Sequence, residues 1–381
     1  MNETIDRDSF RPVKIKNIRD KSELKKVTQG MGFSLVDQIE DFLLELFQLR
    51  NPKYKFIKEY SEDFLKFKLK YLGKKEADSV GNWFYYPWLK TVIHFLPENE
   101  HFELRTGRNK NLITKEEQEI FYNSSIAVLG MSVGSHAALT IAMTGGAKYL
   151  TLADLDVIGG SNLNRIRTGY QNIGVKKVVA VAREVYQMNP YAEVRIFDEG
   201  VTEENLETLF GGKCPLQLIV EEMDNPYFKM RVREIARSKR IPVIMAADHQ
   251  DSCVVDVERF DISKKLPLLH GLLGDKTSQD FKQIVPTDIP KIVSKMAGAN
   301  FSSLRMLESD TEVGKSLYSW PQLGTAATLC GSVLAQLARR IILKEKIASG
   351  RYDVNVERFF FDIPKKDALK RSKMLKMLGI I

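Results

Sequence analysis

The sequence is poor in cysteine, and this excludes two classes of protein. Its 381 residues contain only three cysteines, and no two of them form a C-x-x-C pair (Cys214, Cys253 and Cys330). A zinc site made of cysteines alone needs four, and a disulfide framework needs a higher density. We therefore expect reduced, buried thiols.

Long apolar runs are lacking as well. No run approaches the ~20 residues that a membrane-spanning helix needs. The first residues, Met1-Asn2-Glu3-Thr4, are polar and acidic, whereas a secretory signal has an apolar core. These absences predict a protein with no membrane association and a cytoplasmic location.

Charge is abundant, but it is not concentrated. The chain carries 57 lysines and arginines against 49 acidic residues, a formal charge of +8, with a local basic cluster at residues 365–376. Such runs are more often solvated faces than nucleic-acid grooves, so we do not expect a nucleic-acid partner. An anionic small substrate would explain the same excess.

The stretch from residue 126 to residue 165 has the pattern of half a nucleotide-binding βαβ unit. A short apolar run predicts a buried parallel strand, and an alanine-rich amphipathic segment after a glycine turn predicts a helix. A second strand then leads into two acidic residues. In order, these parts are Ile126–Leu129, the turn from Gly130 to Ser135, His136–Met143, Tyr149–Ala153, and Asp154 with Asp156.

In such a unit the glycine turn binds phosphate, and the acidic residue binds ribose. Backbone N–H groups of a turn without side chains, and the positive end of the helix, attract phosphate. Asp154 follows Gly130 by 24 positions, near the ~20 expected for an acid that binds ribose hydroxyls. However, the usual G-x-G-x-x-G is here Gly130-x-Ser132-x-Gly134, one residue short. The turn alone therefore fits a nucleotide site and an ordinary strand-to-helix turn equally well.

Strands and helices alternate after residue 165, and this predicts the fold class. We expect an α/β, Rossmann-like fold: a mostly parallel sheet with helices on both faces. Residues 1–99 are predicted to form a small α+β N-terminal module and residues 100–381 the nucleotide-binding domain. Further expected elements are a helix over Leu35–Leu49, a helix over Gln322–Leu343 that Gly350 terminates, and a strand over Tyr352–Phe361.

The order of the motifs between Asp154 and Asn225 resembles that of a known family. Asp154-Leu155-Asp156 is followed by Ser161-Asn162-Leu163-Asn164-Arg165, then Gly174 with Lys177, then Asp224-Asn225. This order is similar to the MoeB/ThiF/HesA adenylyltransferases, bacterial relatives of ubiquitin-activating enzymes, over roughly residues 100 to 260. The segment Arg105-Thr106-Gly107-Arg108-Asn109 also resembles the family's N-terminal "RYSRQ" element.

The resemblance implies adenylation of a carboxylate with ATP and Mg²⁺. Asp154, with Asp156 beside it, would hold the ribose, and Asn162 would orient the α-phosphate region. Arg165 and Lys177 would neutralise the charge that builds up on the phosphates.

The resemblance also implies a metal ligand and a dimer. Asp224 would coordinate Mg²⁺, whereas Asn225 is better explained as a helix cap. Arg108 would reach the γ-phosphate of ATP in the partner subunit, which implies a homodimer.

The chain also departs from the family pattern. No cysteine lies between Cys253 and Cys330, and Cys253 starts a predicted buried strand, which is a poor place for a reactive thiolate. We therefore expect adenylation without a thioester step. The shortened glycine turn resembles a subgroup with an N-terminal extension, some of whose members are fused to a nitroreductase-like domain. This resemblance implies a separate flavoprotein as a candidate partner.

Two other readings remain open. A nicotinamide-dependent oxidoreductase would use Gly130, Gly134 and Asp154, but it would leave Arg165, Lys177 and Asp224 without roles. A non-catalytic nucleotide-binding scaffold would use them all without turnover. The activated carboxylate could belong to a peptide, to a ubiquitin-like protein tail, to an amino acid or other small molecule, or to a modified nucleoside on tRNA.

Overall fold

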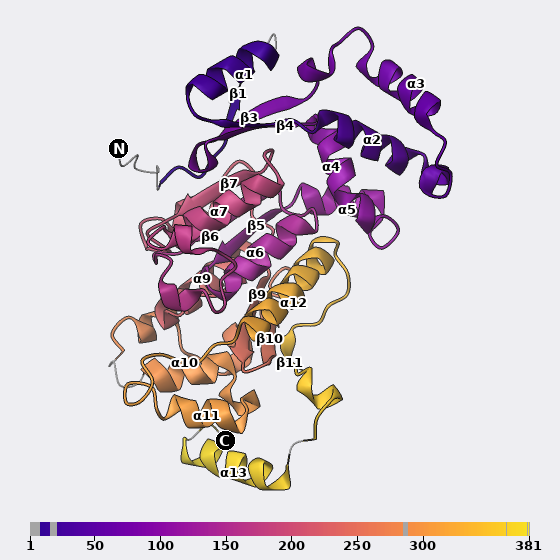
Figure 1. The fold of residues 1–381 in the computed structure, drawn as a ribbon. Helices are drawn as coiled ribbons and strands as arrows, with labels where there is room; N and C mark the ends of the chain where they lie inside the picture. The colour runs from indigo at the N-terminus through magenta and orange to yellow at the C-terminus, as the bar shows by residue number, and fades with distance from the viewer. Residues whose placement is uncertain (1–7, 16–20, 285–288, 363, 379, 381) are drawn as a thin grey trace. The chain divides into compact units, whose positions relative to one another are not determined.

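The computed structural model describes residues 8–15, 21–284, 289–362, 364–378 and 380 (Figure 1). The predicted signal-free segment Met1–Thr4 lies outside them. The chain packs as two compact units, one made of Met1–Glu119 with Arg183–Tyr191 and the other of Ile120–Ala182 with Ala192–Ile381. The domain boundary expected after residue 99 stays a prediction, because compact packing alone does not define an independently folding domain.

The first unit is a small α+β structure, as expected. Its four-stranded sheet has the order β1-β3-β4-β2, in which only the β2–β4 pair is parallel. The strands are β1 (Val13–Ile15), β2 (Ser34–Val36), β3 (Asn82–Tyr86) and β4 (Thr91–Phe95). The helices are α1 (Lys21–Gly30), α2 (Ile39–Arg50), α3 (Ser61–Leu72), α4 (Glu98–Thr106) and α5 (Lys115–Tyr122), the last of which continues into the second unit.

One helix of this unit begins later than its apolar spacing predicted. Leu35 belongs to β2 and pairs with Val92 of β4, so the helix predicted from Leu35 starts only at Ile39. A leucine at helical spacing can equally fill a strand position when a neighbouring strand offers backbone partners. A capping box starts helix α5: the backbone N–H of Thr114 donates to Glu117 Oε2 at 2.8 Å, and that of Glu117 donates to Thr114 Oγ1 at 3.2 Å.

The second unit contains a seven-stranded sheet with the order β11-β10-β9-β8-β5-β6-β7. The strands from β9 to β7 run parallel, while β10 and β11 add an antiparallel edge. Every residue of β5 is buried, which explains its unbroken apolar run. The strands are β5 (Ser125–Leu129), β6 (Tyr149–Ala153), β7 (Glu193–Phe197), β8 (Leu218–Glu221), β9 (Val243–His249), β10 (Ser252–Glu258) and β11 (Gly350–Val354).

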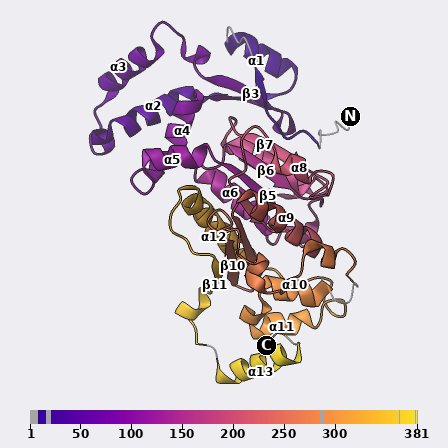
Figure 2. The ribbon, with the colours of Figure 1, turned by 180° about the vertical axis from the view of Figure 1, so that it is seen from behind.

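Helices cover both faces of this sheet. Figures 1 and 2 show α6 and α12 over one face and α8 and α9 over the other. The Rossmann-like α/β fold expected from the sequence is therefore confirmed. The helices are α6 (Val133–Met143), α7 (Lys177–Met188), α8 (Leu206–Phe210), α9 (Pro226–Lys239), α10 (Ile289–Ala297), α11 (Leu304–Asp310), α12 (Gly324–Ile342) and α13 (Lys365–Met377).

The C-terminal elements were predicted with the wrong limits. Helix α12 ends at Ile342, and Gly350 opens strand β11 instead of terminating the helix. That strand stops at Val354, and a 3-10 turn over Glu357–Phe359 follows. The phenylalanines at 359, 360 and 361 are exposed by 84%, 74% and 70%, so their apolar run marks a surface segment and not a buried strand.

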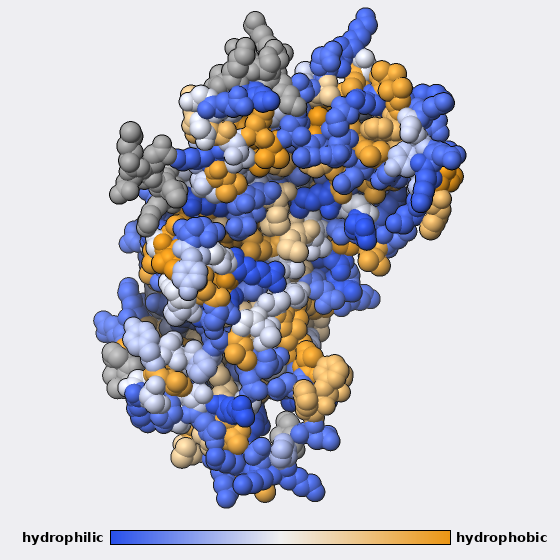
Figure 3. Space-filling view, in the orientation of Figure 1, coloured by the Kyte–Doolittle hydropathy of each residue, from blue (hydrophilic) through white to orange (hydrophobic). Residues whose placement is uncertain are grey.

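Crossing a membrane requires a helix of sufficient length and apolar character. Among the described helices, none has both the length and the apolar character needed to cross a bilayer. On the face shown in Figure 3, hydrophobic residues lie among hydrophilic ones instead of forming a belt.

Candidate nucleotide site

The glycine turn is shorter than the sequence suggested. Helix α6 already begins at Val133, so Gly134 lies in its first turn and not in the loop. Gly130 has a φ of +95°, and a Cβ there would lie 2.3 Å from the carbonyl oxygen of Glu222. Only glycine fits, because both the backbone conformation and the neighbouring strand end exclude a side chain. A Cβ at Gly134 would lie 3.0 Å from Cγ1 of Val128, so this glycine serves helix-to-sheet packing.

Asp154 joins the glycine turn to the end of strand β6. Its Oδ2 accepts a hydrogen bond from the backbone N–H of Met131 at 2.6 Å, and its Oδ1 accepts one from Asp156 at 2.8 Å. Burial raises the pKa of Asp154, and the charge of Lys177 acts in the opposite direction. Because a carboxylate has about four lone-pair sites, two remain for further donors such as ribose hydroxyls.

Lys177 is paired with the second of the two predicted acids. Its Nζ lies 2.7 Å from Asp156 Oδ2 and 4.0 Å from Asp154 Oδ1. Lys177 is buried at the start of α7, whereas Asp156 is exposed. A phosphate that recruited this ammonium group would therefore compete with Asp156 for it. Asp156 acts here as a partner of the lysine.

The Asn162–Arg165 segment brings a cation to the turn. The amide oxygen of Asn162 accepts the backbone N–H of Gly159 at 2.9 Å, which fixes the start of the segment. The half-buried Arg165 donates from Nε to Ser132 Oγ at 3.2 Å and from Nη1 to Asn164 Oδ1 at 3.0 Å. The sequence-predicted residues Ser132 and Arg165 are thus in direct contact.

Two carboxylates influence Arg165 from neighbouring strand ends. Burial lowers the pKa of Arg165, while the negative charges of Asp248 and Asp224 act to raise it. Asp224 is exposed in the connection from β8 to α9. Asn225 is confirmed as a helix cap, because its Oδ1 accepts the backbone N–H of Phe228 at 3.2 Å.

Asp248 joins the site although no sequence motif marks it. This residue is the last but one of strand β9. Gln322 Nε2 donates a hydrogen bond to its Oδ1 at 3.2 Å, and burial raises its pKa. The only available signal for this aspartate is its place at the carboxyl end of a strand, because side chains at the carboxyl ends of parallel strands meet at one edge of the sheet.

A magnesium ion fits this set only together with a nucleotide. Within the described ranges there is no group of three histidine, cysteine or acidic side chains that could hold a metal. Mg²⁺ in nucleotide sites takes one or two carboxylates, and phosphates and waters complete its shell. The exposed carboxylate of Asp224 suits that arrangement.

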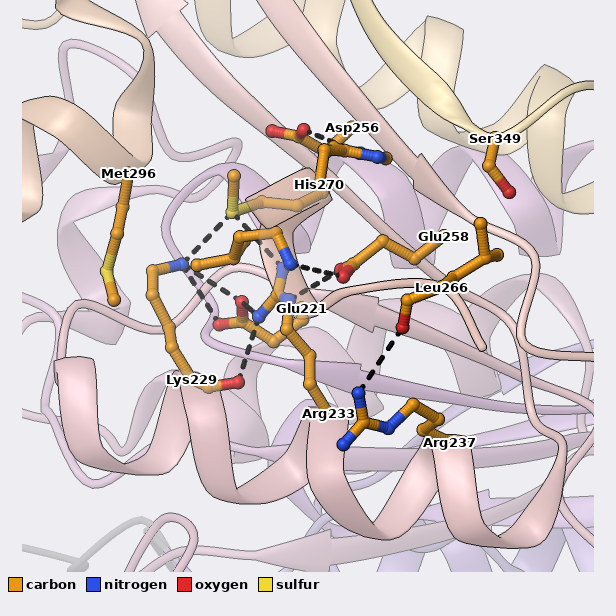
Figure 4. A network of polar contacts seen from close by, with 12 residues as sticks. Glu221, Lys229, Arg233, Arg237, Asp256, Glu258, Leu266, His270, Met296 and Ser349 are labelled. Carbon is orange, nitrogen blue, oxygen red and sulfur yellow. Dashed lines mark hydrogen bonds and ion pairs between the residues drawn. The ribbon is translucent and has the colours of Figure 1, made fainter. Parts of the chain in front are cut away.

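A buried ion network supports the strand end that precedes Asp224 (Figure 4). Glu221 receives Lys229 Nζ at 3.0 Å and also binds Arg233, whose Nε donates to Glu258 Oε2 at 2.6 Å. Although burial acts to raise it, the charges of Lys229 and Arg233 hold the pKa of Glu221 below its ordinary value. Glu221 Oε1 also accepts the backbone N–H of Met223 at 2.8 Å, which ties the network to the chain just before Asp224.

Arg108 belongs to the first unit, whereas the other predicted site residues belong to the second. It lies in the 3-10 turn Gly107–Asn109 of the first unit and is exposed. Its predicted role toward a nucleotide bound by a partner subunit stays a prediction.

A Rossmann-like sheet whose glycine turn carries an acid and an arginine at its edge defines a nucleotide-binding protein of the α/β class. Residues 106–376 match the model of the ThiF family, and the chain belongs to that family. Among the solved structures with a similar fold, Escherichia coli TcdA has been solved in complex with AMP and Escherichia coli MccB with ATP.

Individual relatives agree with this assignment. The chain is 33% identical over 326 residues to the uncharacterized protein MT1398 of Mycobacterium tuberculosis, covering 84% of this chain and 45% of that protein. It is 30% identical over 159 residues to the tRNA threonylcarbamoyladenosine dehydratase of Bacillus subtilis, covering 41% and 61%. The chain thus spans about half the length of the curated relatives it matches. Among solved structures, the Escherichia coli dehydratase TcdA is similar with 20% identity and a TM-score of 0.45 over 64% of this chain and 95% of that one.

Proposed function

We propose that this protein is an adenylyltransferase that activates a carboxylate with ATP and Mg²⁺. One observation carries the proposal: the glycine turn is bound at one point by the carboxylate of Asp154 and at the next by the guanidinium of Arg165. A ribose-binding group and a phosphate-binding group therefore converge on two adjacent residues of the turn, Met131 and Ser132. The pyrophosphate of a nicotinamide cofactor keeps its charge during hydride transfer, whereas adenylation builds up phosphate charge that a cation at this place would neutralise.

The reaction would be an in-line displacement at the α-phosphorus. A carboxylate oxygen of the substrate attacks this phosphorus, the bond to the bridging oxygen breaks, and pyrophosphate leaves with the electron pair. Arg165 neutralises charge on the phosphates from a preformed position, which is more effective than an arrangement made only during the reaction. Lys177 joins it after exchanging Asp156 for a phosphate oxygen, and Asn162 lies at the start of the same segment. Mg²⁺ at Asp224 would supply further neutralisation of phosphate charge.

Assembly and substrate belong to the same proposal. Arg108, exposed in the first unit, would complete the site of a second copy in a homodimer. The acceptor of the adenylate would attack without a cysteine thioester, and a separate flavin nitroreductase-like protein is a candidate partner. The activated carboxylate would be that of a peptide, a protein tail or a small molecule, and the relatives' names add tRNA-borne carboxylates to the compounds worth testing.

ATP–pyrophosphate exchange tests the proposal. Labelled pyrophosphate should enter ATP only when the carboxylate substrate is present. Asp224→Ala and Arg165→Ala should each lower the rate of exchange by about 100-fold or more. Arg167→Ala is the matched control, because Arg167 is an exposed arginine two positions after Arg165 and should keep the wild-type rate. Exchange that survives in both site variants would refute the assigned roles.

A further inference from the structure

The backbone of Arg165 is held by a buried histidine, His136, which belongs to none of the sequence motifs. His136 lies on α6 and is only 2% exposed, and its Nε2 is bound to the backbone carbonyl oxygen of Arg165. A carbonyl can only accept, so Nε2 carries the proton and Nδ1 is left as an acceptor. On that side, the hydroxyl of Thr328 on α12 lies 3.5 Å away. Burial lowers the pKa of His136; the hydrogen bond to the Arg165 carbonyl acts to raise it, and the charge of Arg167 acts to lower it.

The other end of Arg165 is held by the glycine turn itself. Ser132 stands where the usual motif has a glycine, and its hydroxyl accepts from Nε of Arg165 at 3.2 Å. The carbonyl oxygen of Ser132 in turn accepts the hydroxyl of Ser135 at 2.7 Å, so the serine is itself fixed to the start of α6. Within the described residues, Nη2 of Arg165 has no hydrogen bond to protein, so this nitrogen is available to a ligand oxygen.

Helix α12 packs closely against the chain at His136 and at Asn164. A Cβ at Gly331 would lie 2.3 Å from Cβ of His136, and a Cβ at Gly324 would lie 2.6 Å from the carbonyl oxygen of Asn164. Two glycines of one helix therefore approach the two segments that carry His136 and Arg165. Any larger residue at either point would push the helix away from them.

We propose that His136 and Ser132 are positioning residues, which fix the backbone and the guanidinium of Arg165 so that its free Nη2 meets a nucleotide phosphate. This inference rests on the proposed function, since it names how one of its residues is held. The physical reason is that an arginine is long and has many rotamers, so an unfixed Arg165 would lose phosphate contact in most of them. Misplacement of a binding group by ~1 Å can cost about 100-fold in rate.

The test uses the full-length protein and the variants His136→Leu, His136→Gln and Ser132→Ala. Leucine fills the space without a donor, while the amide N–H of glutamine can replace the Nε2 proton. His136→Leu should lower pyrophosphate exchange ~10- to 100-fold and weaken ATP binding about tenfold, with adenosine binding unchanged; His136→Gln should recover most of both losses. Ser132→Ala should raise the KM for ATP more than it lowers kcat. Thr140→Ala, on the same helix, is the control and should match wild type.

Two results would overturn the inference. One is ATP affinity in His136→Leu equal to that of wild type. The other is an equal loss of ATP and adenosine binding that His136→Gln does not recover, because a merely structural role would act on both ligands alike. If wild type shows no exchange at all, the proposed function fails, but the comparison of ATP with adenosine still decides whether His136 positions Arg165.

Discussion

Replacing Arg233 with methionine should destabilise the second unit strongly. Arg233 is fully buried and binds two carboxylates, those of Glu221 and Glu258, while Lys229 supplies the only other positive charge in the cluster (Figure 4). The four charges cancel in the wild type. Methionine fills similar space but leaves one negative charge buried without a partner. Breaking a buried ion pair in this way lowers the free energy of unfolding by about 3–5 kcal/mol.

Urea unfolding at pH 7 measures this loss. Arg237→Met is the matched control on the same helix: Arg237 is only partly buried and donates a single hydrogen bond, to the carbonyl oxygen of Leu266 at 3.3 Å. It should lose less than about 1 kcal/mol. Adding Glu258→Gln to Arg233→Met should restore about 1–2 kcal/mol, because it removes the orphaned charge while keeping an oxygen for the backbone N–H of Leu269. If Arg233→Met cost no more than Arg237→Met, the network would not be a set of balanced buried charges.

Two further predictions concern stability. Gly130→Ala should lower the free energy of unfolding by about 3 kcal/mol or more in the same assay, because the positive φ and the Glu222 carbonyl oxygen, 2.3 Å from the new Cβ, both oppose it. Gly160→Ala is the control and should be nearly neutral, since a Cβ there meets open space. Equal effects of the two substitutions would contradict the packing argument. Burial raises the pKa of Asp310 to about 6, above the ordinary 3.8, so the folded state binds the proton more tightly and stability falls as pH rises through 6. Asp310→Asn should therefore be more stable than wild type at pH 7.5, by about 1 kcal/mol after allowance for solvent screening, and this gain should vanish below pH 4; a gain that does not depend on pH would refute the titration.

The parallel core of the fold could be predicted because each strand carries its own signal. The run at residues 126–129 is wholly apolar, and the structure buries every residue of β5. Leu35 and the phenylalanines at 359–361 show the limit of this approach. Their periodicity and apolar character are compatible with more than one element, and backbone partners far away in the sequence decide between them.

The sequence brought some residues of the candidate site to one turn, but it did not predict their contacts. The motifs placed Asp154 and Arg165 near the same turn, whereas nothing in the sequence predicts that Ser132 accepts from Arg165 or that His136 supports it. These contacts join residues 29 and 33 positions apart. Helix α9 illustrates the same point: its basic residues look like a solvated face, yet Arg233 finds a carboxylate 25 positions away in the core.

Nucleotide binding by the wild type and by Asp154→Ala tests the central claim most directly, because it needs no knowledge of the substrate. Calorimetric titration with MgATP and with NADH compares the two cofactors on the same site. We predict that MgATP binds, that NADH does not, and that Asp154→Ala weakens MgATP binding at least about tenfold through loss of the ribose contact. Binding of NADH in preference to ATP, or an ATP affinity that Asp154→Ala leaves unchanged, would contradict this prediction.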